Sequence, residues 1–226
     1  MSGLNYSSQS LTKQDLVAVE GYLNRTAQAS KNQLTSATGV ETVPRLLVTA
    51  GTQALAATNT TLLASYFICP SDVTVSNFNF ALTVAGTAAS VAVSGFCRIG
   101  LCIPSGLDST TMTVIARSAN SAASLLTANT ATATVPFEAS GIYPASVGLV
   151  AGQQYAIVVW TSSMGTAFTV TPSFAAVAAP TNPSLITTVG PRTTLTAAAT
   201  ATTDLPATLT IAAPTSVGTS VYWRLS

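Results

Sequence analysis

The stretch Ala151-Gly152-Gln153-Gln154-Tyr155-Ala156-Ile157-Val158-Val159-Trp160-Thr161 carries the clearest structural signal in the chain. Its Ala-Gly dipeptide is typical of a turn, and residues 154–161 are rich in the β-branched and aromatic side chains that strands favour. An apolar run of this length predicts a strand that packs in a core or at a subunit interface.

Similar signals recur on both sides of this stretch, from residue 46 to the end of the chain. We predict strands over residues 62–69, 73–84, 91–103, 112–118, 133–139, 154–161 and 168–173, with closing strands over 207–212 and 220–225. Turn sequences separate most of them, as in Pro70-Ser71-Asp72, Ala85-Gly86-Thr87, Pro104-Ser105-Gly106 and Ser140-Gly141. Many short strands at this spacing indicate an antiparallel sandwich or barrel, and we expect a mainly β, jelly-roll-like β-sandwich over residues 46–226.

The amino-terminal segment has a different period. Thr12 could cap a helix, with Asp15 three residues further on. One face of that helix is traced at helical spacing by Leu16, Val19, Leu23 and Ala27. An amphipathic helix cannot bury its apolar stripe alone, so this helix must lie on the body or on another subunit. We expect residues 1–45 to form a helical docking arm, with residues 39–44 as its linker.

Charge is distributed very unevenly along the chain. Seven of its fifteen charged residues lie in the first 45 positions, and only eight lie in the 181 that follow. Soluble domains carry roughly a quarter charged residues and stay soluble through them. A body with so few charges is expected to lie against other protein in an assembly.

Composition argues against several classes of function. The chain has no His, so Ser-His-Asp and Cys-His catalysis are excluded and the commonest metal ligand is missing. Its near-neutral charge disfavours nucleic acid and acidic membrane surfaces. Residues 78–96 form a nineteen-residue uncharged run, but polar residues and Gly86 divide it, so two strands and a turn explain it better than a membrane span. We expect no enzyme activity, no metal or other cofactor, and no signal peptide.

Few residues of the body are candidates for chemistry. Its acidic residues are scattered singly, at Asp72, Asp108, Glu138 and Asp204. We interpret them as turn and cap carboxylates rather than a catalytic pair or a calcium site. Arg98 and Arg117 lie within apolar strands, so we expect each either to pair with a loop carboxylate or carbonyl, or to point outward.

The cysteines are three in number, Cys69, Cys97 and Cys102. Cys97 and Cys102 are five residues apart and would point to opposite faces of one strand. We interpret all three as free, buried thiols of a protein made in a reducing cytoplasm.

Four aromatic residues are candidates for a sugar-stacking surface: Tyr143, Tyr155, Trp160 and Trp223. Glycan contact through Trp160 and Trp223 is one hypothesis, and packing in the core or at a subunit interface is the favoured alternative.

The body also shows an ordered succession of strand ends and turns. These are Phe67-Ile68-Cys69-Pro70, Arg98-Ile99-Gly100-Leu101, Val114-Ile115-Ala116-Arg117-Ser118-Ala119-Asn120, Tyr143-Pro144, Leu149-Val150-Ala151-Gly152-Gln153-Gln154-Tyr155-Ala156, Asp204-Leu205-Pro206-Ala207 and Tyr222-Trp223-Arg224-Leu225. The succession resembles the β-sandwich modules of tailed-bacteriophage virion proteins, over residues 46–226. It carries no catalytic motif, and Cys102 stands where such modules often have an aromatic residue.

The resemblance implies a structural protein of a tailed-phage virion, either a capsid decoration or head-fibre protein or a minor tail protein. We expect the first, docked through its amino-terminal arm and assembled with copies of itself as a trimer on the major capsid or tail proteins. The alternative is a tail appendage that binds host-surface glycan. Such a protein would be synthesised in the host bacterial cytoplasm and located in the virion.

Overall fold

A computed structural model of the chain divides it into two compact units, Met1–Gln33 and Leu34–Ser226. The described residues all belong to the second unit: 35–36, 39–42, 51–54, 61–84, 87–88, 96–107, 109–120, 133–162, 168–170, 172–178, 194–197, 204–212, 215–216 and 219–226. The predicted docking-arm residues Leu16, Val19, Leu23 and Ala27 lie outside them.

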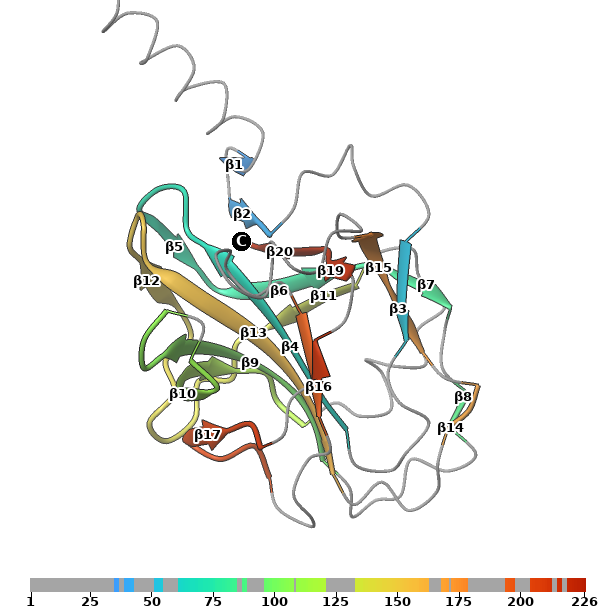
Figure 1. Cartoon of the computed structure of the whole chain (residues 1–226). Helices are drawn as coiled ribbons and strands as arrows, with labels where there is room; N and C mark the ends of the chain where they lie inside the picture. Colours follow the sequence, from blue (N-terminus) through green and yellow to red (C-terminus); the bar gives the residue numbers. More distant parts are fainter. Residues whose placement is uncertain are drawn as a thin grey trace, which may run out of the picture. The chain divides into compact units, whose positions relative to one another are not determined.

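The described part of the chain is mainly β, and its strand pairings are antiparallel, as predicted. A seven-stranded sheet runs through its centre (Figure 1). In spatial order its strands are β17 (Thr208–Thr210), β10 (Thr111–Arg117), β9 (Phe96–Pro104), β13 (Gln154–Ser162), β4 (Thr61–Ile68), β16 (Thr194–Ala197) and β18 (Thr215–Ser216).

The strand β13 lies in the middle of this sheet. It pairs with β4 over residues 154–161 and with β9 over residues 156–162. All nine of its residues are buried, which places apolar side chains on both faces of the sheet. The apolar run that dominates the sequence is therefore the central strand.

A five-stranded sheet joins strands from the two ends of the second unit to two strands from its middle. Its order is β1 (Thr35–Ser36), β2 (Gly39–Glu41), β20 (Trp223–Leu225), β6 (Asn77–Phe80) and β11 (Ala133–Pro136). The pairing of β2 with β20 corrects the linker interpretation for residues 39–41, because Val40 is fully buried opposite Leu225, and residues 43–44 lie outside the described residues. An apolar side chain held in a ladder belongs to the body and not to an arm.

The remaining strands form smaller sheets. The strand β15 (Ser173–Ala178) pairs with β19 (Thr219–Val221), β3 (Gly51–Ala54) and β7 (Leu82–Val84). The strand β5 (Val73–Val75) pairs with β12 (Val147–Leu149), and β8 (Thr87–Ala88) pairs with β14 (Phe168–Val170).

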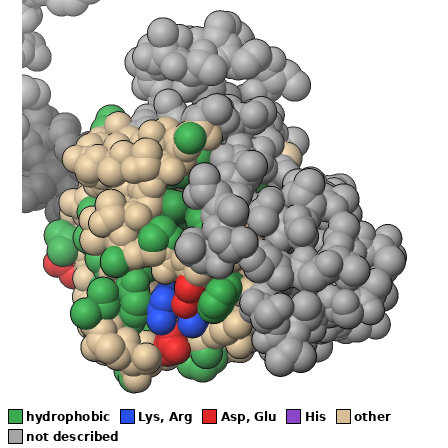
Figure 2. Space-filling model, turned by 90° about the horizontal axis from the view of Figure 1, so that it is seen from below, with side chains coloured by type: hydrophobic (Ala, Val, Ile, Leu, Met, Phe, Trp, Pro, Cys, Tyr) green, Lys and Arg blue, Asp and Glu red, His purple; other side chains and the backbone are tan. Residues whose placement is uncertain are grey.

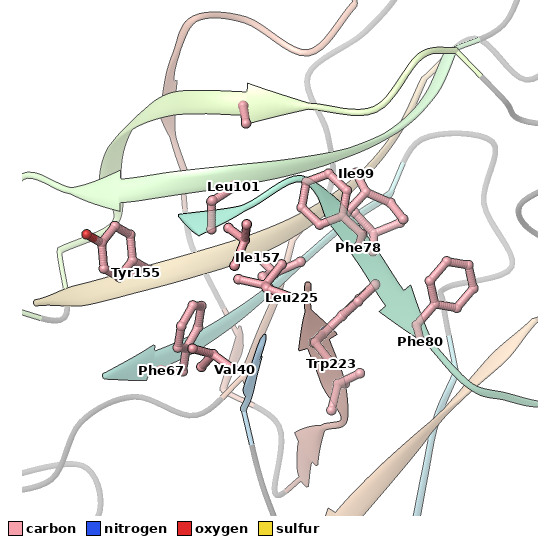
Figure 3. Close-up of a cluster of buried hydrophobic side chains, with 14 of the residues drawn as sticks. Val40, Phe67, Phe78, Phe80, Ile99, Leu101, Tyr155, Ile157, Trp223 and Leu225 are labelled. Atoms are coloured by element: carbon pink, nitrogen blue, oxygen red, sulfur yellow. The ribbon is translucent and has the colours of Figure 1, made fainter. Parts of the chain in front are cut away.

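Two groups of buried apolar residues lie on opposite faces of the seven-stranded sheet. The larger joins residues of that sheet, such as Ile157, to Phe78 and Trp223 of the five-stranded sheet, and Figure 3 shows these side chains directed toward one another. The smaller covers the other face and includes Trp160 and Leu205. Aromatic rings tie the larger cluster together, since Trp223 lies 5.4 Å from Phe80 and 5.3 Å from Phe174 between ring centroids.

Two predicted turns contain glycines in the left-handed region of backbone conformation. Gly141 has a φ of 62° and Gly152 a φ of 78°. Residues with a Cβ rarely adopt these angles, so the Ser140-Gly141 and Ala151-Gly152 signals mark turns for a physical reason. The Ala85-Gly86 turn lies outside the described residues.

Candidate functional site

Half of the charged residues that follow residue 45 converge on one place. Eight charged residues follow residue 45, and four of them form a single network of ion pairs: Arg98, Arg117, Glu138 and Asp204. Figure 2 shows positive and negative side chains gathered on one face, bordered by hydrophobic ones. We call these four residues the charge cluster.

The two arginines of the charge cluster come from neighbouring strands. Arg98 lies on β9, and Arg117 ends β10 opposite Gly100. Gly100 also makes room for the acidic side, because a Cβ there would lie 2.7 Å from the Cδ2 atom of Leu205. Leu205 packs over the sheet at this point, and its neighbour Asp204 is thereby held beside the arginines.

Glu138 reaches the cluster through the chain that follows β11. Phe137 forms an isolated antiparallel bridge with Ser118, the residue after β10. The amide of Glu138 then donates a hydrogen bond to the carbonyl oxygen of Arg117 at 2.7 Å. The backbone at Glu138 is thus fixed next to the strand end that carries Arg117.

Both guanidinium groups bridge both carboxylates. Arg98 donates from Nη1 to Oε2 of Glu138 at 2.9 Å and from Nε to Oδ1 of Asp204 at 2.5 Å. Arg117 donates from Nε to the same oxygen of Glu138 at 2.9 Å and from Nη1 to Oδ2 of Asp204 at 3.2 Å. Charge-assisted bonds of this kind are stronger than neutral ones.

Backbone groups complete the environment of Arg98. Its Nη1 also donates to the carbonyl oxygen of Ser118 at 2.8 Å, and the Arg98 side chain is only 8 % exposed. The fully buried Ser118 accepts a hydrogen bond at its hydroxyl from the amide of Ile99 at 3.0 Å and donates one to the carbonyl oxygen of Ala119 at 2.9 Å. A buried charge is tolerated here because every contact compensates its desolvation.

An aromatic ring covers the cluster on one side. The guanidinium carbon of Arg117 lies 4.5 Å from the centroid of the Tyr143 ring, a cation–π contact. Burial raises the pKa of the Tyr143 hydroxyl, while Arg117 acts in the opposite direction. Tyr143 therefore stays protonated at neutral pH and contributes its ring rather than a charge.

The geometry of the charge cluster suits a structural role, in which it holds neighbouring segments of the chain together. Two positive and two negative groups balance one another, so the cluster offers no net charge to an anion or a cation. It joins four segments of the chain: β9, β10, the chain after β11 and the chain before β17. The expectation that Arg98 and Arg117 pair with loop carboxylates and a carbonyl is confirmed.

The carboxylates agree only in part with their sequence interpretation. Asp72 lies beside its predicted turn, but its Oδ1 accepts a hydrogen bond from the amide of Ala151, 79 positions away, at 2.8 Å. Glu138 and Asp204 are not scattered singly, as the sequence suggested, because both bind the same two arginines. Asp108 lies outside the described residues.

The two tryptophans correct the glycan-contact hypothesis for these positions. Trp160 is 2 % exposed and Trp223 is fully buried, so neither presents a ring face to a sugar. Trp160 packs on one face of the seven-stranded sheet, and Trp223 packs in the larger cluster on the other side. Packing, the favoured alternative, accounts for both residues.

The three cysteines are buried and free, as predicted. Cys97 and Cys102 belong to the clusters on opposite faces of the seven-stranded sheet, which confirms the prediction from their spacing. Burial raises the pKa of Cys97 to about 12 and raises that of Cys102 as well. These thiols are protonated at neutral pH and are poor nucleophiles there.

Among the described residues, no group of three or more His, Cys, Asp or Glu could hold a metal ion. The same residues also contain no helix with both the length and the apolar character needed to cross a membrane. Compared with known proteins, the chain matches no family model and no curated protein.

Proposed function

We propose that this chain is a structural protein of a tailed-phage virion, either a capsid decoration or a head-fibre protein. The observation that carries the proposal is the near absence of ionic groups from a large β-strand body. Eight charges serve its last 181 residues, and four of the eight neutralise one another in the charge cluster. Only four charged residues are then left to keep the surface of this body in solution. So few charges support a role inside an assembly.

Apolar side chains on the exterior support the same proposal. Leu107, Ile142 and Val150 are 74 %, 76 % and 60 % exposed, and Ile68 is 47 % exposed. Ile68 ends β4 opposite Gln154, and Val150 lies in the turn leading into β13, so these two residues share one end of the seven-stranded sheet. Exposed apolar residues on a body with so few charges are suited to contacts with other subunits.

We further propose that the seven-stranded and five-stranded sheets form the two layers of a β-sandwich. The shared cluster of Ile157, Phe78 and Trp223 supports this arrangement, because sandwich layers enclose a common core. In the proposed virion the sandwich points outward, a trimer forms around a threefold axis, and the amino-terminal segment docks on the major capsid or tail proteins.

Localisation in purified virions tests this proposal. Electron cryomicroscopy of particles with and without the chain should show extra density at the head surface, in copies that follow the particle symmetry. Purified chain added to particles that lack it should restore that density. A chain that stays monomeric at high concentration and leaves the particles undecorated would overturn the proposal.

The docking role of the amino-terminal segment needs a separate measurement. Removal of residues 1–33 leaves every described strand in place, so the truncated chain should fold but no longer bind particles. Binding at full-length affinity would contradict the docking role and leave the virion proposal standing.

A further inference from the structure

Two buried hydroxyl groups face each other where β16 joins β4. Ser65 lies on β4 and Thr194 begins β16, and the antiparallel register pairs them directly. Ser65 is 2 % exposed and Thr194 is fully buried. Within the described part of the chain, neither the Oγ of Ser65 nor the Oγ1 of Thr194 has a hydrogen-bond partner.

These hydroxyls lie on the apolar core face of the seven-stranded sheet. Leu63 and Phe67, two residues before and after Ser65, belong to the larger core cluster. On the other side of Ser65, its ladder partner Ile157 belongs to the same cluster. A polar pair in such surroundings loses its hydration on folding and gains nothing from its apolar neighbours.

We propose that one water molecule binds between Ser65 and Thr194. Directly paired residues of an antiparallel ladder have Cβ atoms about 4.5–5.5 Å apart, and hydroxyls across such a gap can both reach a single water. Each hydroxyl donates one hydrogen bond and accepts two, and buried waters bind two to four polar groups. The site is uncharged and has no carboxylate, so its chemistry suits water and not a metal ion.

The bound water gives β16 a polar attachment to the sheet. The strand β16 comes from a segment rich in Thr and Ala, which offers few large side chains for packing. A water held by both strands replaces the hydration that Ser65 and Thr194 lose. It thereby lets a hydroxyl-bearing strand sit beside an apolar core without two unsatisfied groups.

A crystal structure of the full chain, at a resolution where ordered waters are visible, tests the site directly. The expected result is one density peak within hydrogen-bond distance of both Ser65 Oγ and Thr194 Oγ1. A direct hydrogen bond between the two hydroxyls would overturn the proposal, and so would an empty gap between them.

Three variants test the same site in solution: Ser65→Ala, Thr194→Val and the double variant. Each single change removes one of the two partners of the water and strands the other hydroxyl, so it should raise the unfolding equilibrium constant about tenfold. The double variant leaves no polar group to satisfy, so its constant should not exceed that of the worse single variant. Independent effects that multiply to about a hundredfold would contradict a shared water.

A control pair of variants shows how two independent substitutions combine. Ser118 lies three strands away from β4, and its hydroxyl already binds Ile99 and Ala119. The effects of Ser65→Ala and Ser118→Ala should therefore multiply in the combined variant, within the usual error of about twofold.

Discussion

Arg98 donates three hydrogen bonds in and around the charge cluster, one more than Arg117. It binds both carboxylates and the carbonyl oxygen of Ser118, and it is the more deeply buried of the two guanidinium groups. Removal of Arg98 would leave Glu138 and Asp204 to share one guanidinium, and the Ser118 carbonyl would lose a donor. The loss of these bonds lowers the free energy of unfolding, because the carboxylates and the carbonyl have already lost part of their hydration on folding.

We expect Arg98→Met to lower the free energy of unfolding by about 2–3 kcal/mol. Breaking a fully buried ion pair costs about 3–5 kcal/mol, and the lower figure reflects carboxylate side chains that are 22 % and 29 % exposed. Urea unfolding of the two proteins measures the difference. Asp72→Asn is the control, because its exposed side chain keeps an acceptor for Ala151, and it should change stability by less than about 0.5 kcal/mol.

The buried thiols predict a loss of stability in alkali. The ordinary pKa of both thiols is 9.0, and burial raises that of Cys97 to about 12 and that of Cys102 as well. Above pH 9 the unfolded chain releases these protons while the native chain keeps them, so the stabilisation present below pH 9 is lost as the pH rises toward 12. The loss is at most about 1.4 kcal/mol per thiol for each pH unit.

Urea unfolding at pH 8 and pH 10 checks this dependence. The double variant Cys97→Ala/Cys102→Ala should be less stable at pH 8 but should lose much less stability between the two pH values. An equally steep fall in the double variant would assign the effect to other groups, such as Tyr143.

At the scale of elements, several strands rich in β-branched and aromatic residues were predicted well from sequence. The strands β4, β10 and β13 lie within one residue of their predicted bounds at each end. The predicted strand over residues 73–84 is instead three strands, because its parts pair with different partners: β5 with β12, β6 with β11 and β20, and β7 with β15. A local pattern reports extended backbone, but the choice of partner depends on distant residues.

The charge cluster could be predicted only in outline. An arginine in an apolar strand requires a partner, and the sequence shows that much. Glu138 and Asp204 lie 40 and 106 positions from Arg98, and nothing in the local sequence brings them together. The missing side chain at Gly100 is a signal that sequence reasoning overlooked, since it makes room for Leu205 and so places Asp204.

Gly39 tests whether β2 belongs to the body. A Cβ at Gly39 would overlap the backbone carbonyl oxygen of Leu225 in β20, which cannot move without disturbing the ladder. We expect Gly39→Ala to lower the free energy of unfolding by about 1–3 kcal/mol, as overpacking does. Gly148→Ala is the matched control, because no atom lies within 4 Å of a Cβ there. Equal unfolding midpoints for the two variants would mean that β2 is dispensable.

At the scale of the whole molecule, the core is continuous while the charge is concentrated. Residues from β2 to β20 share one apolar cluster, so the two ends of the second unit stabilise each other. The body boundary predicted from sequence, residue 46, followed the loss of charge along the chain. The structure places that boundary at residue 34, because Val40 and Thr42 hold their places through burial and backbone hydrogen bonds that composition does not reveal.

Two truncations separate the body from the segment before it. Removal of residues 1–33 takes away none of the described core, so the free energy of unfolding should stay within about 1 kcal/mol of the full chain. Removal of residues 1–45 also deletes the buried Val40 and exposes the edge of β20. It removes the 2.9 Å hydrogen bond that the Thr42 amide donates to the Trp223 carbonyl oxygen. We expect this second truncation to cost at least about 3 kcal/mol and to promote aggregation, because an unpaired strand edge is a template for pairing. Urea unfolding and size-exclusion chromatography measure both effects. Identical behaviour of the two truncated chains would mean that β2 belongs to the amino-terminal arm and not to the body.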